Sequence, residues 1–220
     1  MTSRSRTFLI VAALSVLLIA ACQPKKEKEY QAVISTEFGD ITVKLFNSTP
    51  QHRDNFVKLV KNGFYDGTLF HRVIQHFVIQ GGDPDSKAAQ PNVMYGTGGT
   101  GYMIDAEIGA PHIRGALAAA RTDNPEKKSS GCQFYIVTGI RQTETELRQY
   151  EAVKKIHYND VQRNLYINEG GVPRLDMEYT VFGQVVSGMD VVDKISNLET
   201  GQGDRPVKDI KMTVKMTDDK

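Results

Sequence analysis

The stretch FHRVIQHFVIQGGD, residues 70–83, is the most informative part of this 220-residue chain. It is an apolar run that ends in Gly-Gly-Asp, a strong turn signal, and we predict one strand over residues 68–80. Alternation along such a strand puts five side chains on one face, namely Arg72, Ile74, His76, Val78 and Gln80. A cation and an amide among aliphatic groups, with Phe77 close by, indicate a mixed polar and apolar site rather than a plain core strand.

Away from this stretch, the pattern predicts many short strands and few helices. Residues 31–46 have the pattern of two strands around a turn at 38–40, and Pro50 fits the first turn of a helix that ends before Gly63. Further elements are expected as strands near 115–120, 132–138, 179–186 and 210–216, and as a short helix at 188–196. This order favours an all-β sandwich or barrel over a βαβ sheet.

The stretch at 70–83 resembles the signature of the cyclophilins, the cyclosporin-binding peptidyl-prolyl isomerases. Three further segments resemble cyclophilin sequence in the same order: GALAAART at 115–122, SSGCQFYIVTG at 129–139 and RLDMEYTVFGQVVSGMDVVDKI at 174–195. Together the segments span about residues 32–216. The resemblance implies a mainly β fold, a closed eight-stranded antiparallel barrel capped by two helices.

Residues 141–172 interrupt the cyclophilin pattern. Thr143 and Glu146 have the spacing of a capping box, which marks the start of a helix. An imperfect helical stripe follows, formed by Leu147, Tyr150, Val153, Ile156 and Val161. We interpret the segment as a helical insertion that packs as a decoration of the barrel. The alternative is a docking surface.

The first 21 residues have the features of a signal peptide. Arg4 and Arg6 precede an apolar run over 8–19, which is shorter than the about 20 residues of a membrane-spanning helix. The sequence Ile-Ala-Ala-Cys that ends at Cys22 resembles the bacterial lipoprotein box, in which the cysteine is lipidated and becomes the mature N-terminus. The alternative is a cleaved secretory signal with a cysteine nearby by chance.

Lipidation at Cys22 sets the expected domain organisation and location. Residues 22–30 would be a lipidated anchor and charged linker, and residues 31–220 one isomerase domain that includes the insertion. The lipid would attach this domain to a membrane of the bacterial cell envelope, facing the periplasm or the exterior. We expect a monomer whose partners are proline-containing unfolded or partly folded polypeptides.

Charge and cysteine content narrow the function classes. The formal net charge is +1, and removing Arg4 and Arg6 with the signal leaves 25 basic against 26 acidic residues. A near-neutral domain gives no reason to expect a nucleic-acid partner. With Cys22 lipidated, Cys132 is the one remaining thiol, so the mature chain can form no internal disulfide. We interpret Cys132 as a small buried residue rather than a reactive thiol.

Two patterns that could indicate a cofactor do not have the necessary context. The sequence GTGGTG at 96–101 fits the dinucleotide-binding motif, but no buried strand precedes it and no long helix follows. The five histidines show no zinc-type spacing, and we interpret His71 as a structural hydrogen-bonding residue. We therefore expect no metal and no other cofactor.

The resemblance implies which residues would form the site. Arg72 and Gln80 would be catalytic, with Arg72 donating to the prolyl nitrogen and Gln80, with the backbone near Arg121, holding the peptide main chain. The proline pocket would be lined by Phe77, Val78, Tyr135, Leu175 and Tyr179. Gln133 would support the groove beside Arg72, and Gly96 would belong to a glycine-rich loop at its border.

The pocket departs from the commonest cyclophilin pattern. Val78 stands in place of a methionine, Tyr135 of a phenylalanine, Tyr179 of a histidine, Arg121 of an asparagine and Arg174 of a tryptophan found in many eukaryotic members. None of these changes removes Arg72 or Gln80, so we expect activity. These changes bear on substrate preference and cyclosporin affinity rather than on Arg72 and Gln80.

The expected function is cis/trans isomerisation of X-Pro bonds in exported or envelope proteins, which assists their folding. A different class of function is a binding module that holds proline-containing segments as a chaperone, with isomerisation incidental. Arg72 favours the enzyme, because a mere binder has no need of that cation.

Overall fold

The computed structural model describes residues 29–217. The predicted signal peptide and the predicted lipidation site, Cys22, lie outside these residues. Within the described range, no helix is both long enough and apolar enough to cross a bilayer.

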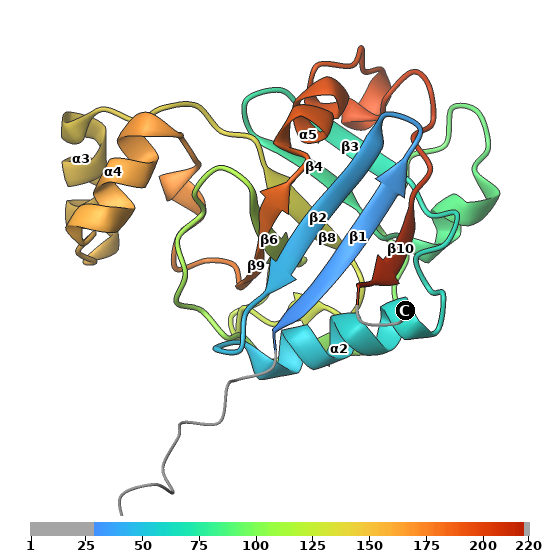
Figure 1. Ribbon diagram of the computed structural model, residues 1–220, viewed down its shortest axis with the longest axis horizontal. Coiled ribbons are helices and arrows are strands. Elements are labelled where there is room, and N and C mark those ends of the chain that lie inside the picture. Colours follow the sequence, from blue (N-terminus) through green and yellow to red (C-terminus); the bar gives the residue numbers. More distant parts are fainter. Residues whose placement is uncertain (1–28, 218–220) are drawn as a thin grey trace, which may run out of the picture.

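Eight strands form one antiparallel sheet that curves into a half-barrel (Figure 1). In spatial order they are β10 (Thr213–Met216), β1 (Tyr30–Thr36), β2 (Gly39–Leu45), β9 (Val181–Ser187), β6 (Ala116–Ala119), β8 (Phe134–Val137), β4 (Val78–Gly81) and β3 (Phe70–Ile74). A separate ladder joins β5 (Met103–Ile104) to β7 (Ser129–Ser130). The prediction of a mainly β fold with eight antiparallel strands is confirmed.

The edge strands β3 and β10 do not pair with each other in a continuous ladder. Leu69 and Lys211 form an isolated antiparallel bridge, and the Phe70 N–H donates to the Ile210 carbonyl at 3.0 Å. Strand pairing therefore gives a half-barrel, and it does not by itself establish the closed barrel that we predicted.

Within residues 29–217, four α-helices accompany the sheet. α2 (Pro50–Lys61) lies across one end of the strands and α5 (Met189–Ser196) lies near the other, as predicted (Figure 1). The other two, α3 (Glu144–Lys154) and α4 (Asp160–Asn168), make up most of the insertion and project to one side (Figure 1). Three short 3-10 segments complete the elements: η1 (Pro84–Ala88), η2 (Pro173–Leu175) and η3 (Gln202–Asp204).

The signature stretch folds as a hairpin, so the prediction of a single strand over 68–80 was wrong. β3 and β4 pair in antiparallel register, with Arg72 directly opposite Gln80. The turn between them contains His76, whose φ of 60° is in the left-handed region. Arg72 and Gln80 still share a face of the sheet, but they do so as cross-strand neighbours.

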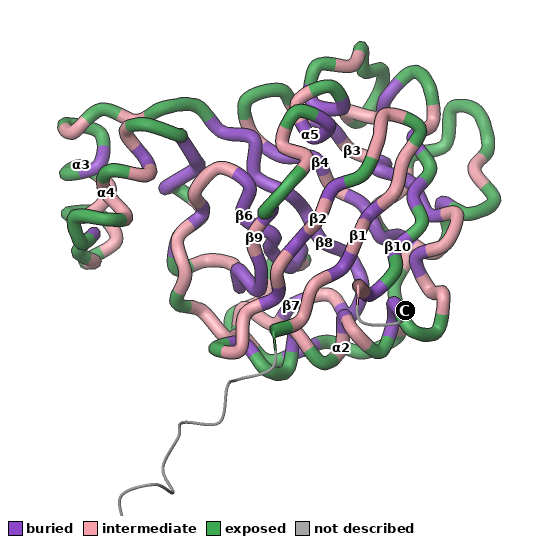
Figure 2. The backbone as a smooth tube through the Cα atoms, viewed as in Figure 1, coloured by how far each residue is buried: buried purple, intermediate pink, exposed green. Residues whose placement is uncertain are grey.

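Alternation along the central strands divides their side chains between two apolar clusters. On β8, Phe134 and Ile136 belong to the barrel core, whereas Tyr135 belongs to a cluster on the opposite face. That second cluster also contains Ala118 of β6 and Ala120 just after it. Figure 2 shows buried residues along these strands. Because alanine fills little space, this outer face can accommodate a hollow.

The insertion begins as predicted and then differs from the prediction. The Thr143 side chain accepts from the Glu146 N–H, and the Glu146 carboxylate accepts from the Thr143 N–H, so the capping box is confirmed. Leu147 is fully buried, whereas Val153 and Val161 are 80% and 68% exposed. The predicted stripe is therefore only partly the packing face of this segment, which forms two helices.

Candidate active site

A chain of hydrogen bonds runs from the glycine loop at residues 96–101 through Gln133 and Gln80 to Arg72. It orients the Arg72 guanidinium. The Gln133 Nε2 donates to the carbonyl oxygens of Gly96 and Gly98 at 2.9 and 2.8 Å. Its Oε1 then accepts from the Gln80 Nε2 at 3.1 Å. The Gln80 Oε1 in turn lies 3.5 Å from the Arg72 Nη1, which donates to it. Each amide thus has both of its ends engaged, and the chain ends at the guanidinium.

Asp204 contacts the same guanidinium from another part of the chain. The Arg72 Nε donates to the Asp204 Oδ2 at 3.3 Å. Asp204 lies in η3 and has a left-handed φ of 59°. Both side chains are partly exposed, so the pair contributes about 0.2–1 kcal/mol. Among the described residues, two guanidinium donors are engaged in this way, which leaves the others for a ligand.

The glycine loop is held by Asp83, the last residue of the signature stretch. Its buried carboxylate accepts from the N–H groups of Gly96 and Gly98 at 2.5 and 3.0 Å. It also accepts from the Asp85 N–H at 2.8 Å. A Cβ on Gly98 would lie 2.1 Å from the Asp83 Oδ1, so this position requires glycine. The structure thus ties the loop to the end of β4.

A cavity of about 130 Å³ opens beside Arg72. Its lining contains all five residues predicted for the proline pocket together with four neighbours: Arg72, Phe77, Val78, Gln80, Ala120, Arg121, Tyr135, Leu175 and Tyr179. The Tyr135 and Tyr179 rings meet edge to face with centroids 5.8 Å apart, and they form two of its walls. The small side chain of Ala120 leaves space between these walls. The arrangement suits a compact apolar ring beside a cation.

A second hollow of about 260 Å³ continues from the first along the glycine loop. It shares Gln80, Ala120 and Arg121 with the cavity and adds Gln133 and Gly96. The two hollows together form a groove, with Gln80 lining both. An extended peptide could therefore occupy the groove on both sides of a residue held in the cavity.

Two further arginines cover aromatic rings at the rim. The Arg121 guanidinium lies 4.8 Å from the centre of the Tyr179 ring, and the Arg174 guanidinium lies 4.1 Å from that of Phe77. The Arg121 Nε also donates to the Glu178 carbonyl at 3.0 Å. Stacking of this kind holds the planar guanidinium against the ring, and on Arg121 all three nitrogens also donate to neighbouring protein oxygens. The groove therefore has a basic rim.

Besides Asp83 and Gly98 of the loop anchor, three contributors to this site were not predicted. Ala120 could have been found, because the run of alanines at 116–120 marks a face without bulk. Asp204 contacts Arg72 across 132 residues of sequence, and no local pattern marks it. The third contributor is His112, whose Nε2 lies 3.0 Å from the Tyr135 hydroxyl.

The predictions for Cys132 and His71, two titratable residues near the site, have different outcomes. Cys132 is buried, as predicted, and burial raises the pKa of its thiol to about 11. His71 was predicted to make structural hydrogen bonds, but neither ring nitrogen has a partner of ordinary geometry among residues 29–217. The same residues contain no group of three or more His, Cys, Asp or Glu side chains that could hold a metal ion.

Comparison with known proteins agrees with this geometry. Residues 31–216 match the family described as cyclophilin type peptidyl-prolyl cis-trans isomerase/CLD. A Staphylococcus aureus protein named "Putative peptidyl-prolyl cis-trans isomerase" is 34% identical over 186 residues, covering 84% of this chain and 90% of that protein. A Staphylococcus epidermidis protein of the same name is 35% identical over the same shares.

Solved structures show the same relationship. A Cryptosporidium parvum cyclophilin type peptidyl-prolyl cis-trans isomerase superposes with a TM-score of 0.64 at 25% identity, covering 86% of this chain and 98% of that chain. The same protein in the presence of the dipeptide Ala-Pro gives a TM-score of 0.62 at 25% identity, covering 84% and 98%. The chain belongs to the cyclophilin-type peptidyl-prolyl cis-trans isomerases.

Proposed function

We propose that this isomerase twists X-Pro bonds of exported proteins in the cavity beside Arg72, with Arg72 as the catalytic group. The observation that carries the proposal is the position of a guanidinium, fixed through Gln80, at the mouth of a cavity walled by Tyr135 and Tyr179. The solved relative that was studied with Ala-Pro supports a proline-containing ligand for such a groove.

The chemistry follows from the amide bond. Resonance between the nitrogen lone pair and the carbonyl makes rotation slow, over tens to hundreds of seconds for an X-Pro bond. In the twisted state the lone pair is released and can accept a hydrogen bond. Arg72 is always charged, so it can donate to the prolyl nitrogen at that moment. This interaction is stronger in the transition state than in the ground state, which is the requirement for catalysis.

The magnitude of the Arg72 effect can be estimated. A hydrogen bond to a charged group contributes about 1.5–3 kcal/mol. Each tenfold acceleration needs about 1.4 kcal/mol, so Arg72 accounts for about tenfold to a hundredfold. The remainder would come from the groove, which holds the chain on both sides of the twisting bond while the proline ring stays in the cavity.

The test uses the soluble domain and a short X-Pro peptide. We expect Arg72→Ala to lower kcat/KM by about tenfold to a hundredfold with an unchanged circular dichroism spectrum. Arg148→Ala is the matched control, because Arg148 is an exposed arginine on α3 that lines neither hollow of the groove and pairs with Glu144. Full activity of folded Arg72→Ala would contradict the mechanism.

Barrel closure would matter for this mechanism, because β3 carries Arg72 and is an edge strand of the paired sheet. We propose that residues 68–70 and 210–212 close the barrel. The bridge between Leu69 and Lys211 and the Met212 N–H bond to the Thr68 carbonyl, 2.8 Å long, support closure. Slow hydrogen exchange at the Phe70 and Met212 amides is expected, whereas exchange as fast as in an exposed loop would contradict it.

The location of the protein is a separate proposal. The signal-like segment and the Ile-Ala-Ala-Cys sequence support lipidation of Cys22, a cell-envelope location and exported clients. Mass spectrometry of protein purified from membranes should find an acylated N-terminal cysteine, and Cys22→Ser should lack the modification. A lipid-free mature chain that starts at another residue would refute the anchor and leave the isomerase mechanism unaffected.

A further inference from the structure

Asp176 is a buried carboxylate with four hydrogen-bond donors around it. Its Oδ1 accepts from the backbone N–H of His112 at 2.7 Å and lies 2.9 Å from the His112 Nδ1. Its Oδ2 accepts from the hydroxyls of Tyr158 and Tyr166 at 2.5 and 2.7 Å. All four residues are buried. A charge removed from water needs such donors, so each of them contributes to keeping this carboxylate in place.

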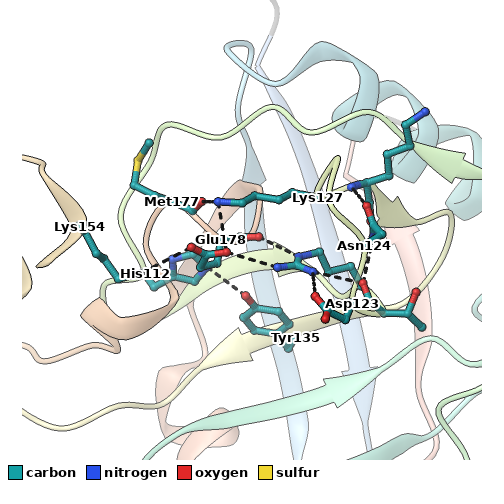
Figure 3. Close-up of polar contacts among 11 residues, drawn as sticks. His112, Asp123, Asn124, Lys127, Tyr135, Lys154, Met177 and Glu178 are labelled. Atoms are coloured by element: carbon teal, nitrogen blue, oxygen red, sulfur yellow. Dashed lines mark hydrogen bonds and ion pairs between the residues drawn. The ribbon is translucent and has the colours of Figure 1, made fainter.

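His112 connects the carboxylate to the wall of the proline cavity. Asp176 can only accept at Oδ1, so the His112 Nδ1 carries the hydrogen. A neutral imidazole with its hydrogen on Nδ1 has Nε2 as an acceptor, and the Tyr135 hydroxyl that can donate to it lies 3.0 Å away (Figure 3). Burial raises the pKa of Tyr135 well above its ordinary value of 10, which keeps the hydroxyl protonated as a donor. The Tyr135 ring is therefore fixed at its far end by the imidazole.

The insertion supplies two of the donors on Asp176. Tyr166 lies in α4 and Tyr158 just before it, and their rings meet with centroids 5.2 Å apart. Together with Leu147 they form a small buried cluster of the insertion. Burial raises the pKa of both tyrosines, so both hydroxyls stay protonated and donate. Without this segment, Oδ2 of a buried carboxylate would lose its two protein donors.

The insertion also approaches the opposite wall of the cavity. Lys154, at the end of α3, places its Nζ 4.0 Å from the Glu178 Oε1 (Figure 3). The other oxygen of Glu178 lies 3.4 Å from the Arg121 Nη2 and 3.2 Å from the Lys127 Nζ. Arg121 in turn covers the Tyr179 ring. The two tyrosine walls of the cavity are thus both linked to the insertion.

We propose that His112 and Asp176 are positioning residues for Tyr135 in the proline pocket, and that insertion 141–172 holds them in place. The inference rests on the proposed isomerase function, and it gives the insertion a role other than the decoration expected from the sequence. Small displacements of a group that positions a substrate can cost up to about a hundredfold in rate. Loss of one of four donors should shift Asp176 only partly, so about a threefold to tenfold loss is expected.

Removal of single hydroxyl groups tests the idea with little change in volume. Tyr158→Phe and Tyr166→Phe each delete one donor to Asp176 and keep the aromatic ring. Tyr150→Phe is the matched control, because Tyr150 lies in α3 of the same insertion outside this network. We expect kcat/KM to fall by about threefold to tenfold in the first two variants, measured well below each Tm, and to be unchanged in the control.

A double-mutant cycle tests whether the effect passes through Tyr135. In a Tyr135→Phe background, the far end of the network is already disconnected from His112. Tyr166→Phe should then change kcat/KM by less than about twofold, because interacting sites are not additive. An undiminished effect in this background would overturn the proposed route. Lower Tm with unchanged kcat/KM in both insertion variants would also overturn it, since that outcome indicates a purely structural role.

Two readouts separate this proposal from the proposed role of Arg72. The imidazole nitrogen resonances of His112 should change in Tyr166→Phe but not in Tyr150→Phe. The Kd of an Ala-Pro-containing peptide, followed on the Tyr135 resonances, should rise in Tyr166→Phe and needs no turnover. If Arg72→Ala proved fully active, the Arg72 mechanism would fail while these comparisons remained decisive. Unchanged His112 resonances in Tyr166→Phe would refute the positioning network itself.

Discussion

Acid should destabilise this protein through His71, which directly precedes Arg72 in the chain. The His71 side chain is 2% exposed, and burial lowers its pKa from the ordinary 6.5 to about 4, although the charge of Asp83 opposes the shift. The imidazole is thus neutral in the folded protein at pH 5 but mostly charged in the unfolded chain. A group with a depressed folded-state pKa favours folding above its unfolded pKa and loses that contribution as the pH falls.

The size and pH window of the effect follow from these values. The difference between 6.5 and about 4 corresponds to about 3 kcal/mol, at 1.36 kcal/mol per pKa unit. Stability contributed by neutral His71 is complete above pH 6.5 and declines until about pH 4, where both states bind the proton. Burial also lowers the pKa of His52 against the effect of Glu107, so the wild-type protein should show a further loss of the same sign.

The assay is urea denaturation at several pH values between 4 and 7, which isolates His71 when wild type and His71→Leu are compared. Between pH 7 and pH 4, the free energy of unfolding should fall by about 3 kcal/mol less in His71→Leu than in wild type. His76→Asn is the matched control, because His76 is exposed and asparagine tolerates its left-handed backbone. Parallel stability curves for wild type and His71→Leu would refute the reasoning.

Three further predictions concern the groove. Asp204→Asn should lower kcat/KM by about 1.4-fold to fivefold through weaker positioning of Arg72, because a partly exposed ion pair contributes about 0.2–1 kcal/mol; a gain in activity would mean that Asp204 competes with substrate. Gly98→Ala should lower the free energy of unfolding, measured by urea denaturation, by about 1–3 kcal/mol, because its Cβ would meet a buried carboxylate. Gly99→Ala should leave that free energy unchanged, since nothing lies within 4 Å of its Cβ. The wild-type domain should bind cyclosporin weakly, and Arg174→Trp should tighten binding about tenfold to a hundredfold by calorimetry; tight wild-type binding or no gain would contradict this account of the rim.

Most strands could be predicted from the sequence. The two breaks that could not be predicted lie where the chain turns without a glycine. The hairpin between β3 and β4 turns at Gln-His-Phe, with His76 in the left-handed conformation. The insertion breaks into two helices at Lys155, which has a φ of 55°. Neither residue type is a turn signal, so periodicity continued through both breaks in the prediction. Asn159 and Gln162 do form a second capping box, and that local signal could have located the start of α4.

The site was predictable as far as its residues lie in contiguous segments. The five residues predicted to line the proline pocket do line one cavity, although no strand alternation brought Leu175 or Tyr179 there. Those two positions came from the family resemblance. Asp204 and Asp176 could not be found from either source, because their roles depend on contacts between distant segments. Only the three-dimensional structure brings a carboxylate beside Arg72 and another behind Tyr135.

The polarity of the hydrogen-bond chain explains why the signature stretch ends in an aspartate. The carbonyl oxygens of Gly96 and Gly98 can only accept, so they bind the amide nitrogen of Gln133. Asp83 determines where those carbonyls lie, since it binds the N–H groups of the same two glycines. The Gln133 oxygen must then face the nitrogen of Gln80, and the Gln80 oxygen must face Arg72. The acid that ends the stretch therefore orients, through the glycine loop and two amides, the arginine near its start. A reversal of either amide would break this chain, so the orientation of the guanidinium depends on a carboxylate that never touches it.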